Sequence, residues 1–535
     1  TPARISSTQG TRCTLHSMKI TTLLPLLLCS TIYAQHPRDF IADDAMSVLS
    51  IKDGNAINAI IETIYEKTES TSAKVEYLDI FLSQFIDDPT AVDLSSELLL
   101  VVEPTVLSEG QPPAGMFGAM PHMQIICKAK EGRTLSVSSS SWLKASTTVD
   151  GWFIASGDNK VNVRKGTGLS EIFETMPDTQ AGWVIRFAPL WQQFGPIAQM
   201  TGGMFIGSMN KPDLSGVISK EQRNTTASAR KAFKALTAWC ATIEKFSFGA
   251  DIEDFVLTTT VEIESKDKSN LTIDNGSMHE MATYLNDSMV QYAMSGDFIR
   301  QLLEIDERTF DSIASYASAP PTFLISSMRF LANVAEENVV AYGLNSKNGL
   351  TLASLIDVNN QVEYLKEAST AVNSLSEQVL EEFSMKLSES KMPHTWDISM
   401  MGEDEENQNM MDAVVHPGDQ LRLKKQGTER VAIAFGPQAW RAFGSPYATS
   451  LSQVIRRHSK QVEIDFALAV DFRDFSTGFI EILNEINPDE QAVLSQSPSA
   501  KCSLLYGSTL GGAYVEAQLN VMGLAILFAE LDALD

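Results

Sequence analysis

The chain has 535 residues, 44% of them hydrophobic, and a net charge of −26 at pH 7. This hydrophobic content excludes an intrinsically disordered chain, and the length predicts more than one hydrophobic core. The acidity disfavours nucleic acid and anionic lipid headgroups as general partners, because both carry negative charge themselves.

A secretory leader is predicted near the N-terminus. Lys19 supplies a positive charge, residues 23–28 form a leucine-rich core, and Ala34 is a small residue before a cleavage site. The apolar core is much shorter than the roughly 20 residues that span a bilayer. We therefore expect residues 1–17 to be an upstream segment outside the fold and residues 18–34 to be a signal peptide.

The expected mature chain starts at Gln35 and is periplasmic or secreted. The first 34 residues hold three basic residues and no acidic residue, so the mature net charge is −29. Lipidation at Cys29 is an alternative, which the bulky Leu28 just before it disfavours. No later segment is long and apolar enough to suggest a transmembrane helix.

Residues 35–90 are predicted to form an N-terminal helical segment. Isoleucines recur at helical spacing through residues 57–64, and large apolar residues do so through residues 75–85. Pro89 ends this pattern because proline cannot continue a helix.

Strand-like and helix-like stretches alternate after residue 90, which predicts an α+β fold. The expected helices include residues 227–245 and a long helix over residues 362–387, where apolar residues recur every three or four positions. The closing strand pairs have short connections, so the sheets should be mainly antiparallel. The expected strands include residues 98–102, 124–130, 134–139, 152–156, 183–187, 246–250, 255–263, 431–435, 462–470, 502–506 and 513–520.

The order of these elements predicts an internal duplication. A strand, a helix, a second strand, a helix and a closing strand pair follow Gly151, and the same order follows Arg430. We therefore expect two related α+β halves at residues 91–300 and 301–535, after the N-terminal helical segment. Two similar halves create an interface between them, where ligands often bind.

The leader at Met18, the strand that ends at Ser156-Gly157 and the strand-then-helix unit from Ala181 resemble those of large uncharacterised exported bacterial proteins with duplicated α+β halves. The resemblance is a pattern over the chain without a diagnostic motif. It implies no activity and no site residues.

Catalytic and cofactor motifs are absent from the sequence. It contains no P-loop, no G-x-G-x-x-G, no H-E-x-x-H, no C-x-x-C and no G-x-S-x-G. The histidines after residue 36 are widely separated, so a zinc site would need distant segments. We therefore assign no catalytic residue, no metal ligand and no cofactor, and an enzyme is disfavoured.

Three cysteines lie in the mature part: Cys127, Cys240 and Cys502. They are far apart and have apolar neighbours, so we expect buried, free thiols rather than a disulfide framework.

Two apolar segments are the candidate ligand-binding residues. Residues 112–121 and 200–207 both mix Met, Phe and Gly, a composition that suits a pliable lip over an apolar groove. Core packing under a loop is the alternative. The candidate residues are Met116, Phe117, Met120, Met204 and Phe205.

A basic stripe is a further candidate for docking. Arg223, Arg230 and Lys234 share one face of the predicted helix, with Lys231 beside them. The stripe could bind an acidic partner or phosphate, or could be a solvated helix face with internal ion pairs.

The leading hypothesis is an exported envelope protein that binds a partner protein or an apolar ligand without catalysis. The overall negative charge favours a neutral lipid or a protein over an anionic lipid. The alternatives are a periplasmic hydrolase with a site assembled from distant residues, and a structural envelope component.

Overall fold

The computed structural model places most of the chain from residue 36 onward. It describes residues 36–67, 77–104, 122–158, 176–208, 220–266, 273–285, 289–298, 335–345, 349–375, 384–402, 405–436, 449–486, 491–494 and 499–533, and single residues 161, 163, 172, 300, 380 and 443.

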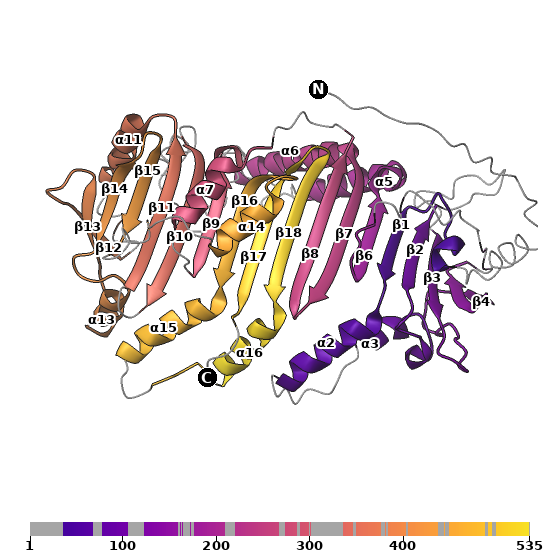
Figure 1. Cartoon of the computed structure of the whole chain (residues 1–535). Coiled ribbons are helices and arrows are strands. Elements are labelled where there is room, and N and C mark those ends of the chain that lie inside the picture. Colours follow the sequence, from indigo (N-terminus) through magenta and orange to yellow (C-terminus); the bar gives the residue numbers. More distant parts are fainter. Residues whose placement is uncertain are drawn as a thin grey trace, which may run out of the picture.

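A sheet of 18 strands runs through this described part of the chain (Figure 1). The strands of the first half are β1 (Ser47–Ile51), β2 (Leu98–Glu103), β3 (His122–Lys128), β4 (Ala145–Val149), β5 (Trp152–Ser156), β6 (Ala181–Arg186), β7 (Ile243–Glu253) and β8 (Val256–Ser265). The strands of the second half are β9 (Val290–Ser295), β10 (Ala335–Asn345), β11 (Gly349–Val358), β12 (Met385–Glu389), β13 (Thr395–Met400), β14 (Gln420–Gln426), β15 (Arg430–Phe435), β16 (Glu463–Asp471), β17 (Lys501–Thr509) and β18 (Gly512–Asn520).

Helices lie at both ends of the strands and on the faces of the sheet (Figure 1). They are η2 (Pro37–Phe40), α2 (Gly54–Lys67), α3 (Tyr77–Ser83), η3 (Pro89–Ala91), α5 (Phe187–Ser208), α6 (Lys220–Thr242), α7 (Gly276–Tyr284), α11 (Gln361–Asn373), α13 (Glu405–Val414), α14 (Ser450–His458), α15 (Phe472–Ile486) and α16 (Val521–Asp532).

The strand pairings repeat once along the chain, and all of them are antiparallel. From its outer edge inward, the first half pairs in the order β4-β5-β3-β2-β1-β6-β7-β8. The second half pairs in the order β14-β15-β11-β10-β9-β16-β17-β18, with β13 and β12 added outside β14. The halves join through β8 and β18, which pair over their whole length.

The expected α+β class with two related, mainly antiparallel halves is therefore confirmed. The repeat runs from β1 to β8 and from β9 to β18, so it begins upstream of residues 91 and 301. The N-terminal segment includes strand β1, which lies between β2 and β6 and so belongs to the first half.

Tight turns set the register of neighbouring strands. Asp150 and Gly151 join β4 to β5 with positive φ angles of 51° and 83°, as a two-residue hairpin turn requires. Asp254 and Phe255 join β7 to β8 in the same way, with φ angles of 49° and 63°. Phe255 is unusual there, because bulky side chains rarely adopt this region.

Side chains of the first half are buried on both faces of the sheet. In β5, Ile154 packs with Phe40 and Val48 on one face. Its neighbours Phe153 and Ala155 join the cluster around Leu82 of α3 on the other face. This alternation follows from the two-residue period of a strand.

In the second half, α7 and α14 cover one face of the sheet. Met281 and Ile455 from these helices pack over Leu355 and Ala467 from the strands. The capping box between Thr449 and Ser452 fixes the start of α14.

One long helix predicted from the sequence is wrong. The stretch from residue 362 to 387 splits into α11, which ends at Asn373, and strand β12, which starts at Met385. Leu387 keeps the helical spacing but pairs with Ile398 of β13, so sheet pairing overrides the local pattern. Among the described residues, no helix combines the length and the apolarity needed to cross a bilayer.

Candidate functional site

Helices α5 and α6 form a hairpin between β6 and β7. Gly202 makes their close approach possible, because an added Cβ there would lie 2.2 Å from Cζ of Phe233. The contact brings the part of α5 just before Phe205 against the part of α6 in which Arg230 and Lys234 flank Phe233 in sequence. At the base of the hairpin, α5 packs on β7.

The hairpin exposes large apolar side chains. On α5, Met204 is 69% exposed and Phe205 is 66% exposed, and Met200 is exposed one turn earlier. On α6, Leu236 and Trp239 are about half exposed. Such a concentration of exposed apolar side chains marks an interaction site more often than an ordinary surface.

The charge of the hairpin is opposite to that of the chain. None of the 22 residues of α5 is charged, whereas the 23 residues of α6 include five basic residues and one acidic residue. The net charge is therefore +4, within a chain of −26. Arg223, Arg230 and Lys234 are exposed and lie seven and four residues apart, so they form one basic stripe.

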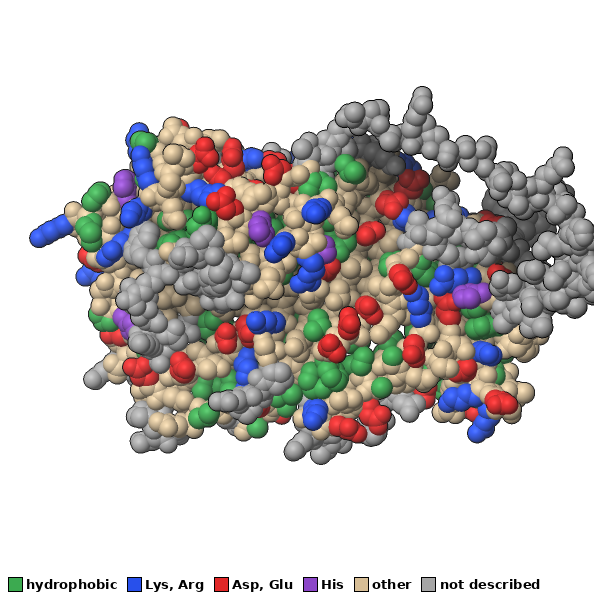
Figure 2. All heavy atoms as spheres, in the orientation of Figure 1, with side chains coloured by type: hydrophobic (Ala, Val, Ile, Leu, Met, Phe, Trp, Pro, Cys, Tyr) green, Lys and Arg blue, Asp and Glu red, His purple; other side chains and the backbone are tan. Residues whose placement is uncertain are grey.

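A second apolar surface lies on α15 and α16, at the opposite ends of the strands (Figure 1). Phe472, Phe475, Phe479 and Leu483 recur at spacings of three and four along α15 and are all exposed, as is Phe528 of α16. Figure 2 shows apolar side chains gathered along this lower edge of the molecule. Each of the two helices has a net charge of −2, because only Arg473 offsets their acidic residues.

The structure places two of the five candidate ligand-binding residues. Met204 and Phe205 lie in the last turns of α5, so this segment is helical rather than a loop. The glycines beside them are compatible with a helix, since Gly202 packs against α6 and Gly203 has open space around it. Met116, Phe117 and Met120 lie outside the described residues.

A buried polar row links three neighbouring strands of the first half. The Nδ1 atom of His122 lies 3.1 Å from Oε2 of Glu103, and its Nε2 atom lies 2.7 Å from Oγ of Ser156. This order of Ser, His and carboxylate is the one that activates serine nucleophiles. No sequence motif marks these residues as a group, although each stands at one end of an apolar strand.

The surroundings of this row favour a structural role. Ser156 is fully buried, and its Oγ accepts the backbone N–H of Asp158 at 3.1 Å. The Asp158 carboxylate lies 3.3 Å from the same His122 nitrogen, so it competes with the serine. Glu103 also accepts the side-chain N–H of Gln124. The row therefore satisfies buried polar groups of β2, β3 and β5.

The three cysteines placed by the structure are free. Cys127 is buried, and burial raises its pKa to about 12. Cys240 and Cys502 are only partly buried, so the expectation of burial is wrong for these two. Among the residues that the structure describes, no group of three or more His, Cys, Asp or Glu side chains could hold a metal ion.

Comparisons with known proteins add little to this picture. No protein-family description and no curated protein matches the chain. Three solved structures, crystal forms III, I and IV of TP0453, are similar at 7%, 8% and 6% identity. They cover 47%, 50% and 48% of this chain and 97%, 99% and 97% of their own, with TM-scores of 0.22, 0.20 and 0.23. Similarity at this level supports no conclusion about fold or function.

Proposed function

We propose that the protein binds the surface of an anionic membrane through the α5–α6 hairpin. The observation that carries the proposal is the coincidence of two features on one hairpin: exposed Met204 and Phe205, and the basic stripe of α6. A helix with a basic polar face and large apolar side chains suits the membrane interface, where it lies parallel to the surface. Export to the cell envelope, as expected from the leader, would bring the hairpin to such a surface.

The local charge decides between lipid classes. The chain as a whole would be repelled by anionic lipid, but the Debye length at physiological salt is only about 8 Å. The stripe from Arg223 to Lys234 is about 17 Å long at 1.5 Å per residue, so it extends over about two Debye lengths. Its attraction to lipid therefore outweighs repulsion from acidic residues on distant parts of the sheet.

The expected strength follows from the basic residues. Each Lys or Arg near an anionic surface contributes about 1 kcal/mol to binding. Replacing Arg223, Arg230 and Lys234 by Gln removes about 3 kcal/mol, which corresponds to a loss of about 100-fold in vesicle partitioning. A control triple variant, Arg133→Gln, Arg456→Gln and Lys460→Gln, removes the same charge from exposed positions elsewhere.

Vesicle co-sedimentation tests the proposal. Vesicles of phosphatidylcholine with about one third phosphatidylglycerol should bind the wild type and the control, but not the stripe variant. Pure phosphatidylcholine should bind weakly, through the apolar side chains alone. Equal binding by both triple variants would overturn the proposal. Failure of the wild type to bind anionic vesicles would do the same, and would favour a protein partner for the hairpin.

Salt provides a second signature of a basic stripe on an acidic protein. At about 0.01 M salt the Debye length is about 30 Å, so the whole negative chain is repelled by the vesicle. At about 1 M salt it is about 3 Å, and the attraction of the stripe is screened as well. Binding should therefore be strongest at intermediate salt, near 0.1 M.

The hydrolase alternative has one supporting arrangement, the row of Glu103, His122 and Ser156. We make no second functional proposal from it, because a serine that is fully buried cannot reach a substrate in this conformation.

A further inference from the structure

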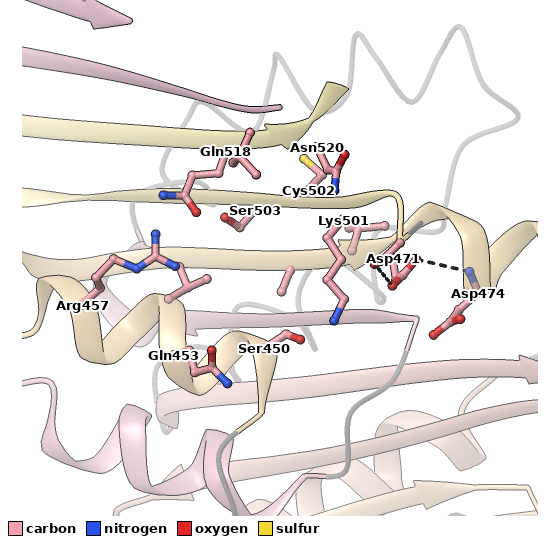
Figure 3. Close-up of a pocket in the computed structure, with 15 residues that line it drawn as sticks. Ser450, Gln453, Arg457, Asp471, Asp474, Lys501, Cys502, Ser503, Gln518 and Asn520 are labelled. Carbon is pink, nitrogen blue, oxygen red and sulfur yellow. Dashed lines mark hydrogen bonds between the residues drawn. The ribbon is translucent and has the colours of Figure 1, made fainter. Parts of the chain in front are cut away.

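A cavity of about 520 Å³ lies between α14 and the inner strands of the second half (Figure 3). Helix α14 contributes Gln453 and Arg457 to its wall, and strands β17 and β18 contribute Lys501, Ser503 and Gln518. Val256 of β8 also lines it, so the cavity borders the seam between the two halves. It lies apart from the α5–α6 hairpin in sequence and is built by other elements.

The hydrogen-bond donors of this cavity are largely unused. Lys501, Gln453 and Gln518 make no side-chain hydrogen bond or ion pair with any described residue. Arg457 makes one contact, from Nη1 to Oε1 of Glu516 at 3.4 Å, which leaves its other N–H groups available. Glu516 has two further partners, His458 at 3.1 Å and the Tyr514 hydroxyl at 2.9 Å, so it does not depend on Arg457.

Two carboxylates, those of Asp471 and Asp474, also line the cavity, and Asp471 is already bonded within the protein. Asp471 accepts the Ser499 hydroxyl at 2.7 Å on one oxygen, and the backbone N–H groups of Arg473 and Asp474 at 3.1 and 3.4 Å on the other. These N–H groups belong to the first turn of α15, where a negative charge is stabilised. The charge of Asp471 is thus balanced locally. Asp474 lies with it at the start of α15, whereas the unused donors of Arg457, Lys501, Gln453 and Gln518 come from α14, β17 and β18.

We propose that this cavity binds a small organic anion through its carboxylate or phosphate group. Arg457 and Lys501 supply the positive charge, and the carboxamides of Gln453 and Gln518 donate further hydrogen bonds to the anion or its substituents. The volume exceeds that of inorganic phosphate alone, so the ligand has an organic part, which the side chains of Val256 and Val454 can contact. The proposal is independent of membrane binding by the hairpin.

Isothermal titration with three probes tests the site: inorganic phosphate, glycerol 3-phosphate and glutarate. We expect saturable binding of glycerol 3-phosphate or glutarate with a Kd below roughly 1 mM, and weaker binding of inorganic phosphate. A preference for glycerol 3-phosphate over glutarate indicates a phosphate ester as the ligand, and the opposite preference indicates a carboxylate. The absence of saturable binding by all three probes would overturn the proposal.

Matched variants locate the binding. Arg457→Gln with Lys501→Gln should weaken it at least tenfold. Arg456→Gln with Lys460→Gln removes the same charge from residues beside the cavity that do not line it, and should change binding less than twofold. Lys501→Gln alone guards against misfolding, since Lys501 is exposed, and should still weaken binding measurably. Equal loss in both pairs would also overturn the assignment.

Discussion

The α5–α6 hairpin and helix α15 occupy the same place in the repeated topology. The hairpin connects β6 to β7, and α15 connects β16 to β17. Both expose aromatic and aliphatic side chains, but the hairpin has a net charge of +4 and α15 one of −2. The apolar character of these two surfaces is therefore common to both halves, whereas the charge is specific to each.

This difference shows which parts of a duplicated fold are free to diverge. All seven strand pairings of the first half recur in the second, because backbone hydrogen bonds and two-sided burial hold the sheet together. Exposed positions contribute little to stability and can change charge at small cost. If exposed apolar side chains alone determined the partner of a surface, the hairpin and α15 would bind the same partner. The two surfaces differ in net charge.

The first way to test the comparison is to remove the apolar side chains of each surface. Met204→Ser with Phe205→Ser should reduce binding to anionic vesicles about 30-fold, since it removes about 2 kcal/mol of apolar burial. Phe475→Ser with Phe479→Ser should leave vesicle binding unchanged. Thermal melts should show both double variants close to the wild type, because all four residues are exposed. Equal loss of binding in the two variants would mean that charge does not distinguish the surfaces.

The second test gives the charge of the hairpin to its counterpart. Glu481→Lys with Glu485→Lys changes the net charge of α15 from −2 to +2 and leaves its aromatic stripe intact. We make these changes in the variant whose basic stripe on α6 is replaced by Gln, and we expect its binding to anionic vesicles to increase about tenfold. Each new lysine contributes about 1 kcal/mol to binding, less the part that salt screens. Co-sedimentation measures the gain. No gain would mean that the geometry of the hairpin, rather than its charge, governs binding.

The third test concerns the neighbours of a buried glutamate side chain in each half. Glu103 of the first half is paired with His122, whereas Glu337 of the second half lies opposite Asp357 across β10 and β11. Burial and the nearby Asp357 raise the pKa of Glu337 to about 7, although a hydrogen bond from Ser277 opposes the shift. The folded state therefore keeps a proton that the unfolded state loses above pH 4.5.

The sign of the pH effect follows from this raised pKa. The free energy of unfolding should fall between about pH 5 and 7 as the unfolded state ionises first, and the contribution of Glu337 should be constant above its folded pKa. After allowance for its partial exposure, the loss should be about 1 kcal/mol. Glu337→Gln should flatten this part of the stability profile in urea titrations. Asp43→Asn, at an exposed position of the first half, should leave it unchanged.

The sequence by itself determined the fold class and the duplication. Alternation of apolar residues in segments such as 152–156 and 462–470 reports burial on a sheet, and the order of segments repeats because the strand pairings do. The apolar segment around Phe205 and the basic stripe around Arg230 were also visible as separate signals. Each depends only on local spacing, which a sequence displays directly.

Only the tertiary structure decided how these signals combine. Gly202 and Phe233 bring the apolar segment and the basic stripe together on one hairpin, and the proposal of anionic membrane binding rests on this combination rather than on the net charge of the chain. The donors around Arg457 and Lys501 come from segments 44 residues apart, and Glu103, His122 and Ser156 come from three strands. Non-local contacts of this kind are set by strand pairing and packing of the whole chain, so no local pattern of residues predicts them.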